Sequence, residues 1–304
     1  MQDRRQFIGS AAAGVAAAGL PFASACRAQG ALFSISLAQW SVNRRIFGGE
    51  LDALDFPAFT KETFGIDAVE YVNQFFMDKA QDRAWLTELR NRCEDSGVRS
   101  LLIMCDREGN LGDPDAAART QAVENHYKWV EAAEFLGCHS IRVNAGSSGT
   151  WEEQRELAAD GLRRLSEFGA GHGLNVIVEN HGGLSSNGQW LTEVIAGVGL
   201  DNCGTLPDFG NFRIGQGEEY DRYRGVEELM PFAKGVSAKS YGFAAAGNET
   251  TIDFRRMLRI VLDAGYRGYV GVEWEGATPG DIEGIRLTQS LLERLRTELA
   301  PDYA

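Results

Sequence analysis

Short apolar runs alternate with longer stretches of helical periodicity along most of the chain. In the longer stretches apolar residues recur three and four positions apart, as at Phe254, Met257, Leu258 and Val261, which is the spacing of an amphipathic helix. The short runs have the length and composition of buried strands. They predict strands at residues 33–39, 66–71, 98–105, 139–144, 174–179, 203–208, 235–239 and 269–273.

Glycines mark the ends of several predicted helices. A glycine just after a helix takes a positive φ at little cost, and one stands shortly before a predicted strand at Gly65, Gly97, Gly137, Gly173 and Gly265. Strict alternation of strand and helix predicts parallel strands, and eight such units close most naturally into a barrel. No GxGxxG motif follows the first strand, which disfavours a doubly wound dinucleotide-binding fold. The expected fold is α/β, a single (β/α)8 TIM barrel that forms the catalytic domain over residues 29–304.

The first residues have the pattern of an export signal. Paired Arg4 and Arg5 precede an Ala- and Gly-rich apolar stretch, and small residues follow before Cys26. This order is typical of a twin-arginine signal segment, which we place at residues 1–28, and it predicts cleavage and a periplasmic location. The stretch is too short to span a bilayer, and a short helix of the mature domain is the alternative. Cys26 is a candidate lipid anchor, although Ala23 stands where a lipidation motif usually has Leu.

Composition narrows the class of partner. With 44% hydrophobic and 24% charged residues the chain can bury a full core. Its net charge of −13, from 43 acidic and 30 basic residues, repels nucleic acid and anionic lipid. A small molecule is therefore the expected partner, and the sequence leaves the oligomeric state open. Core thiols, rather than a disulfide framework or a zinc site, are expected at Cys93, Cys105, Cys138 and Cys203.

Polar residues at the predicted strand ends are the candidates for chemistry, because a (β/α)8 barrel builds its active site there. Glu179, Asp208 and Glu273 each end a predicted strand. Three neighbouring carboxylates repel one another unless protons or a cation neutralise them, and a hard divalent ion is the usual solution. Helix N-capping is the alternative for any one of them. The other polar strand-end residues are Gln39, Trp40, Glu70, Asp106, Arg142, Asn144, Asn180, His181, Asn211, Ser237, Lys239 and Glu275.

Two further features bear on the ligand. Asn180 and His181 lead into a Gly- and Ser-rich loop at residues 182–187, which suits a hydroxyl-rich ligand or is an ordinary β-to-α turn. Lys239 can pair with the carboxylates, orient a substrate carbonyl, or form a Schiff base if burial lowers its pKa. A structural salt bridge is the simplest interpretation of this lysine.

Three motifs carry a resemblance to a known family: VENHGG at residues 178–183, LPDFGNF at 206–212 and GVEWEG at 271–276. With them the chain resembles the xylose isomerase-like superfamily of TIM barrels, also called the sugar phosphate isomerase/epimerase family, over residues 32–298. The resemblance implies that Glu179, Asp208 and Glu273 bind a divalent metal (Mn, Mg, Co or Zn). It also implies that the two glutamates exchange a proton with the substrate.

The chain departs from the family pattern at two places. Asn211 stands where many relatives have a histidine three residues after the aspartate, and Ser237 stands where the histidine ligand of strand seven is expected. Loss of these imidazoles predicts a metal held mainly by oxygens. A metal-free site that uses Lys239 is the alternative.

The resulting hypothesis is a sugar isomerase or epimerase that removes a proton next to the carbonyl of a neutral keto-sugar with the help of a divalent metal. Export and net charge argue against a sugar phosphate. Two alternatives are a lyase or hydrolase of 3-keto-glycosides that uses the same site, and a catalytically silent sugar-binding barrel. In the main hypothesis the catalytic residues are Glu179, Glu273 and Lys239, and the substrate-binding residues are Asn180, His181, Asn211, Ser237 and Arg142.

Overall fold

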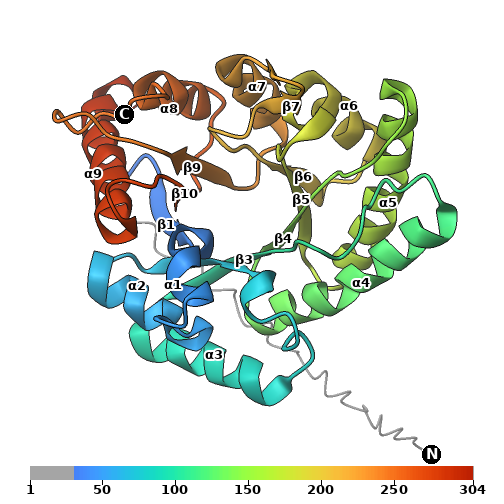
Figure 1. Ribbon diagram of the computed structural model, residues 1–304, viewed down its shortest axis with the longest axis horizontal. Coiled ribbons are helices and arrows are strands. Elements are labelled where there is room, and N and C mark those ends of the chain that lie inside the picture. Colours follow the sequence, from blue (N-terminus) through green and yellow to red (C-terminus); the bar gives the residue numbers. More distant parts are fainter. Residues whose placement is uncertain (1–30, 304) are drawn as a thin grey trace, which may run out of the picture. The chain divides into compact units, whose positions relative to one another are not determined.

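The computed structural model describes residues 31–303, so the predicted signal segment and Cys26 lie outside the described residues. The described part is a ring of parallel strands surrounded by helices (Figure 1). The strands of the ring are β1 (Ser34–Ala38), β2 (Ala68–Val72), β3 (Arg99–Met104), β4 (Ser140–Val143), β5 (Asn175–Glu179), β6 (Cys203–Leu206), β9 (Val236–Ser240) and β10 (Tyr269–Trp274).

The strands lie in the order β6-β5-β4-β3-β2-β1-β10-β9, so β1 pairs with both β2 and β10. Isolated parallel bridges join the two ends of this sheet, from Thr205 to Ala233 and from Asp208 to Ser237. At this seam the amide of Ser237 donates to the carbonyl of Pro207 at 2.9 Å. The (β/α)8 prediction is therefore confirmed, with a seam that is paired more sparsely than the rest of the barrel.

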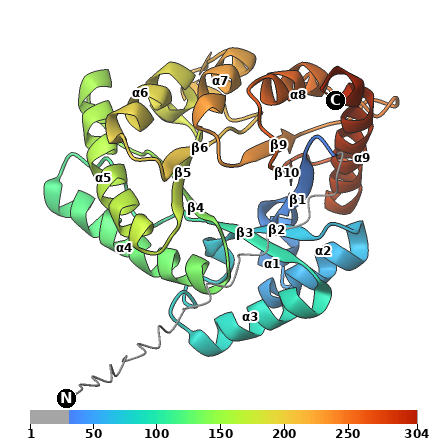
Figure 2. The ribbon, with the colours of Figure 1, turned by 180° about the vertical axis from the view of Figure 1, so that it is seen from behind.

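Helices cover the outside of the strand ring, as the views from its two ends show (Figures 1 and 2). They are α1 (Asn43–Phe47), α2 (Phe56–Phe64), α3 (Arg83–Ser96), α4 (Ala116–Phe135), α5 (Trp151–Gly171), α6 (Gly188–Val198), α7 (Arg222–Leu229), α8 (Phe254–Asp263) and α9 (Asp281–Leu299). Short 3-10 segments are η1 (Gln39–Val42), η2 (Ala53–Asp55), η3 (Asn73–Phe75), η4 (Gly183–Ser186), η5 (Met230–Phe232) and η6 (Ala300–Asp302). The predicted helix-ending glycines all have positive φ, between 64° at Gly97 and 81° at Gly265.

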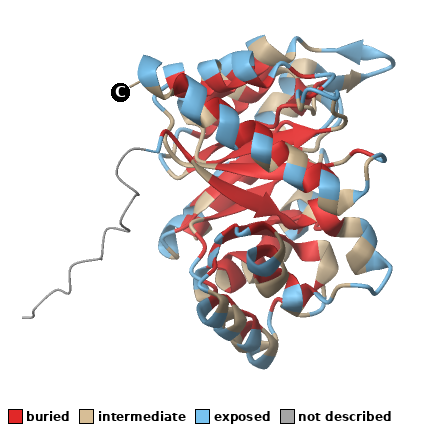
Figure 3. Cartoon of the chain, turned by 90° about the vertical axis from the view of Figure 1, so that its left-hand side faces the viewer, coloured by how far each residue is buried: buried red, intermediate tan, exposed pale blue. Residues whose placement is uncertain are grey.

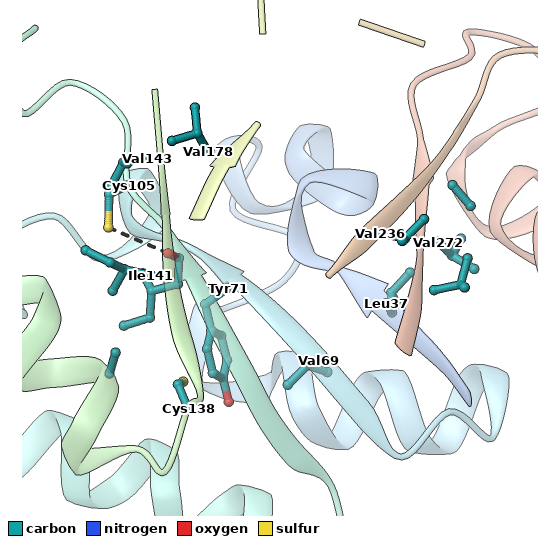
Figure 4. Packing of buried hydrophobic residues seen from close by; sticks show 14 of the residues in the cluster. Leu37, Val69, Tyr71, Cys105, Cys138, Ile141, Val143, Val178, Val236 and Val272 are labelled. Atoms are coloured by element: carbon teal, nitrogen blue, oxygen red, sulfur yellow. Dashed lines mark hydrogen bonds between the residues drawn. The ribbon is translucent and has the colours of Figure 1, made fainter. Parts of the chain in front are cut away.

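The main core lies between the strands and the helices. Alternate strand residues such as Val178 and Val272 pack against the helices, and Figure 4 shows them with Leu37, Val69 and Val236. Ile177, the neighbour of Val178, belongs to a separate small cluster because successive strand residues point to opposite faces. Buried residues fill the strands while exposed ones follow the outer helix faces (Figure 3). The four cysteines of the barrel are buried and free, as predicted.

One element was missed by the sequence analysis. The connection between β6 and α7 contains a small antiparallel hairpin, β7 (Arg213–Gly215) and β8 (Glu218–Glu219), which turns at Gln216 and Gly217 with positive φ. Its strands are short and largely exposed, so they carry no alternation of apolar and polar residues that would signal a strand. Within residues 31–303, every helix is too short or too polar to span a bilayer.

Candidate active site

Three buried carboxylates meet at the carboxyl ends of the strands. Glu179 ends β5, Asp208 follows β6 at the seam, and Glu273 lies near the end of β10. One oxygen of each lies within 4.8 Å of the others, and each side chain is almost completely buried. The structure thus brings together the three acids that the sequence analysis selected. Their role as metal ligands stays a prediction.

Two buried cations neutralise part of this charge. Arg142 Nε lies 2.7 Å from Glu179 Oε2, and Arg142 Nη1 lies 2.8 Å from Asp106 Oδ1. Lys239 Nζ lies 3.1 Å from Glu273 Oε1 and 4.0 Å from Asp208 Oδ2. Each glutamate of the cluster therefore has its own cationic partner, Arg142 for Glu179 and Lys239 for Glu273.

Lys239 is a cation in these surroundings. Burial by itself lowers the pKa of Lys239, but the attraction of Asp208, Glu273 and Glu179 outweighs it and holds the pKa well above its usual value. A Schiff-base nucleophile needs a neutral amine. The geometry therefore favours charge pairing over the Schiff-base interpretation of this residue.

Ser237 links two of the acids. Its Oγ lies 2.7 Å from Asp208 Oδ2 and 2.7 Å from Glu273 Oε2. A hydroxyl carries a single proton, so one of these contacts needs a proton on the carboxyl group. Burial, with Glu273 and Glu179 nearby, raises the pKa of Asp208. Burial alone would also raise the pKa of Glu273, but Lys239 and Ser237 reverse the effect and lower it. Asp208 is thus the member that more readily holds a proton.

The amide of Asn180 orders the loop that carries Asp208. Its Oδ1 accepts from the amide of Asp208 at 2.8 Å, and its Nδ2 donates to the carbonyls of Asp208 and Asn211 at 3.0 Å each. Asn211 Nδ2 in turn donates to Glu179 Oε1 at 2.8 Å. Asn180 and Ser237 are completely buried, so we assign both to positioning the carboxylates rather than to the predicted substrate contacts.

Two adjoining cavities open above the cluster and share His181 and Glu275. The first lobe, about 340 Å³, is lined by Trp40, Val72, Gln74, Asp106, Arg107, Arg142, His181, Glu273 and Glu275. The second lobe, about 510 Å³, is lined by His181, Gly182, Gly210, Asn211, Arg213, Glu219, Arg222, Tyr241, Thr251 and Glu275. A cavity of about 630 Å³ beside α8 and α9 touches none of the three acids, so size alone does not indicate the site.

Glu273 lines the first lobe directly, whereas Glu179 lies deeper. The partners of Glu179, Arg142 and Asn211, are themselves lining residues, one in each lobe. Of the predicted substrate contacts, the structure thus places Arg142, His181 and Asn211 on the cavity walls.

Several lining residues were given no catalytic or binding role in the sequence analysis. Trp40 Nε1 donates to Glu275 Oε1 at 2.8 Å, and its ring stacks on Phe75 with 6.0 Å between centroids. Arg107 has a φ of 62°, a left-handed conformation that non-glycine residues adopt rarely and often at functional sites. Trp40 and Glu275 were recognisable from the sequence as polar residues at predicted strand ends. Arg107 has no such sequence pattern, because only its backbone conformation distinguishes it from other residues.

A fourth acid, Glu70 on β2, is buried inside the barrel. Ser36 Oγ donates to Glu70 Oε1 at 2.6 Å, and Oε2 has no hydrogen-bond partner among residues 31–303. Gly271 makes room for it, since a Cβ there would lie 2.6 Å from Glu70 Oε1. Burial, offset in part by Ser36, raises the pKa of Glu70 to about 7.

We expect Glu70→Gln to remove a pH-dependent loss of stability. Between the unfolded pKa of 4.5 and the folded value of about 7, unfolding releases the proton of Glu70, so stability falls as the pH rises through this window. Glutamine does not titrate. At 1.36 kcal/mol per pKa unit, the variant should gain about 3 kcal/mol over the wild type between pH 4.5 and 8. Urea unfolding at both pH values measures this gain, with the exposed Glu62→Gln as control. If Glu70→Gln changes the free energy of unfolding equally at both pH values, the raised pKa of Glu70 is contradicted.

Comparison with known proteins agrees with the fold and the motifs. The family model of the xylose isomerase-like TIM barrels matches residues 58–297, so the chain belongs to this family. The fold superposes on 3-keto-D-glucoside 4-epimerase from E. coli with a TM-score of 0.66 and 17% identity, over 80% of this chain and 94% of that one. It superposes on a xylose isomerase-like barrel from Mycobacterium smegmatis, solved in complex with magnesium, with a TM-score of 0.67 and 16% identity, over 88% and 98% of the chains.

Two curated proteins match a shorter stretch. The chain is 33% identical over 75 residues to the alpha subunit of 3'-dehydrocarminate deglycosidase from Microbacterium sp., which is 23% of this chain and 22% of that protein. It is 40% identical over 73 residues to the alpha subunit of a C-glycoside deglycosidase from Arthrobacter globiformis, which is 22% of this chain and 21% of that protein. The match thus spans about a fifth of the length of either relative.

The donor set fits a hard divalent ion. Glu179, Asp208 and Glu273 offer carboxylate oxygens, and among the described residues no imidazole or thiol joins them. Oxygen-only ligands suit magnesium or manganese better than zinc, which takes nitrogen and sulfur readily. Ser237, at the position where the resemblance implies a histidine ligand, bridges two of the acids. Lys239 brings one positive charge to the same oxygens.

Proposed function

We propose that this protein is an isomerase or epimerase of neutral keto-sugars that removes and returns a proton on the carbon next to the carbonyl. The observation that carries this proposal is the meeting of Glu179, Asp208 and Glu273 beneath an open cavity, with a separate cation beside each glutamate. Membership of the xylose isomerase-like family supports it. So does the structural similarity to a 3-keto-D-glucoside 4-epimerase.

Glu273 faces the first lobe and acts as the base. Its carboxylate takes the proton from the carbon, and the electron pair of the C–H bond moves into the carbonyl to give an enediolate. Glu179, held between Arg142 and Asn211, begins the cycle protonated and gives that proton to the opposite face, so that Glu273 ends the cycle protonated and Glu179 ionised. Arg142, which lines the first lobe, stabilises the negative charge that develops on the substrate oxygen.

Glu179, Asp208 and Glu273 would hold the divalent ion, and when bound it polarises the carbonyl and so acidifies the adjacent C–H bond. Arg142 positions the Glu179 carboxylate through Nε and is itself fixed by Asp106. Asn180 keeps the Asp208 backbone in place. Trp40 offers an aromatic face to the first lobe, against which a sugar ring can pack.

The charges on the first lobe support a neutral sugar. Asp106, Glu273 and Glu275 line it together with Arg142 and Arg107. Arg142 is already paired with two carboxylates, and a phosphate would lie close to three acids. The proposed substrate is therefore uncharged, in keeping with the proposed export to the periplasm.

A second candidate reaction is favoured by the two deglycosidase relatives. In a 3-keto-glycoside the ketone acidifies the hydrogen on C2. If a base removes that proton, the electron pair can form the C1–C2 double bond while the group on C1 leaves with its bonding pair and takes a proton from an acid. The same two glutamates supply this base and acid, so elimination and epimerisation share their first step.

Deuterium exchange separates these reactions from simple binding. With a methyl 3-keto-glucoside in D₂O and added Mn²⁺ or Mg²⁺, we expect one deuterium next to the carbonyl in recovered sugar, detected by NMR and mass spectrometry. An unchanged mass apart from deuterium indicates isomerisation or epimerisation, and a split mass indicates elimination. Binding of the sugar by calorimetry without any exchange would favour the silent barrel and overturn the proposal.

A further inference from the structure

The cavity at the barrel mouth does not end at the catalytic acids. The first lobe, with Glu273 and Arg142, has a volume of about 340 Å³, near the lower end of the range for small-molecule sites. The second lobe adds about 510 Å³ and shares His181 and Glu275 with the first. A group attached to a sugar in the first lobe would enter the second lobe past these two side chains.

An arginine with an unpaired side-chain nitrogen lines the second lobe. Arg222, the first residue of α7, lines it, and its Nη1 is buried without a hydrogen-bond partner among the described residues. A buried donor left unpaired destabilises the fold. This nitrogen is covered by protein atoms, so a ligand in the lobe contacts the other atoms of the Arg222 side chain.

A glycine shapes one wall of the second lobe. A Cβ at Gly210 would lie 2.4 Å from Tyr241 Oη and 3.0 Å from Lys239 Cδ. Tyr241 can lie against the chain here only because residue 210 has no side chain. Its phenol and the exposed imidazole of His181 give the lobe both polar atoms and flat faces.

The charges of the second lobe are balanced. Arg213 and Arg222 line it together with Glu219 and Glu275, and Arg213 pairs with Glu219 at 3.5 Å. An anionic group would meet the two glutamates, and a cationic group the two arginines. Hydroxyl groups both donate and accept, so a neutral, hydroxyl-rich group matches this lining best.

We propose that the second lobe is a subsite for a second neutral sugar ring, so that the substrate is a keto-disaccharide rather than a free monosaccharide. This inference rests on the proposed function and names its substrate class. The oxidised ring occupies the first lobe beside Glu273 and Arg142. The second ring lies between Arg222 and Tyr241 and contributes binding energy without touching the acids.

Substrate pairs and one variant test the subsite. For wild-type protein, kcat/KM for 3-keto-cellobiose or 3-keto-maltose should exceed that for the methyl 3-keto-glucoside of the same anomeric configuration at least tenfold. Arg222→Ala should lower this ratio about tenfold. Arg155→Ala, on the outer surface between α5 and α6, should leave the ratio as it is. Equal kcat/KM for both substrates, or equal losses on both in Arg222→Ala, would overturn the inference.

Binding affinities measured by calorimetry show whether the subsite inference or the proposed function has failed. If neither substrate exchanges a proton, the proposed function fails, and the affinity for cellobiose and maltose against the matching methyl glucosides still decides the subsite. A disaccharide preference of tenfold that Arg222→Ala removes supports a second sugar ring. No preference overturns it. If the methyl 3-keto-glucoside exchanges its proton but disaccharides bind no more tightly, the subsite inference is overturned and the proposed function stands.

Discussion

Glu273→Gln is expected to lower the rate of proton exchange by about 10³-fold, the typical contribution of a positioned general base. Glu273 is the one member of the acid triad that lines the first lobe. In glutamine the amide oxygen can still accept from Lys239 and the amide nitrogen can donate to Ser237 Oγ, so the fold should be retained while the base is lost. Exchange into a methyl 3-keto-glucoside measures the loss, and circular dichroism checks the fold.

Glu179→Gln should give a different result if the two glutamates work on opposite faces. Glu273 would still exchange the substrate proton, whereas inversion would fall by about 10³-fold because the returning acid is gone. Glu193→Gln, which removes a surface pair with Arg155, serves as the matched control. A folded Glu273→Gln protein with wild-type exchange would rule out the assigned base.

Lys239→Met is expected to cost about 3–5 kcal/mol of unfolding free energy, the usual effect of removing one partner of a buried charge pair. Lys239 is almost completely buried, and its ammonium is shared by Glu273, Glu275 and Asp208. Methionine has a similar length and no charge, so the carboxylates would be left without their cation. Urea unfolding measures the loss, and Lys239→Arg should recover part of it.

The same variant reports on the metal site. A divalent ion would supply the missing charge to Glu179, Asp208 and Glu273, so added Mg²⁺ or Mn²⁺ should raise the Tm of Lys239→Met more than that of the wild type. Lys79→Met, which breaks a pair with the exposed Asp78, should change stability by less than about 1 kcal/mol and show no metal effect. Equal metal responses in Lys239→Met and wild type would contradict a shared site.

The order of the barrel could be predicted because strand and helix periodicity are local properties. Each strand of the ring begins and ends close to its predicted bounds, and Gly65 or Gly265 ends a helix for a reason visible in a few residues. The carboxyl ends of parallel strands meet at one rim, so Glu179, Asp208 and Glu273 could be selected together. Each of these inferences needs only the local sequence around the residue and the rule that alternating strands and helices form a parallel barrel.

Tertiary structure alone decided which groups pair and which spaces stay open. Arg142 lies between Glu179 and Asp106, and Ser237 bridges two acids, because strands distant in sequence are neighbours in the barrel. The second lobe and the unpaired nitrogen of Arg222 depend on how the hairpin, α7 and the β9–α8 loop come together. Side-chain pairing and cavity shape depend on long-range packing, which no local pattern encodes. The sequence by itself thus determined the barrel and its acids, and packing determined their partners and the room for a substrate.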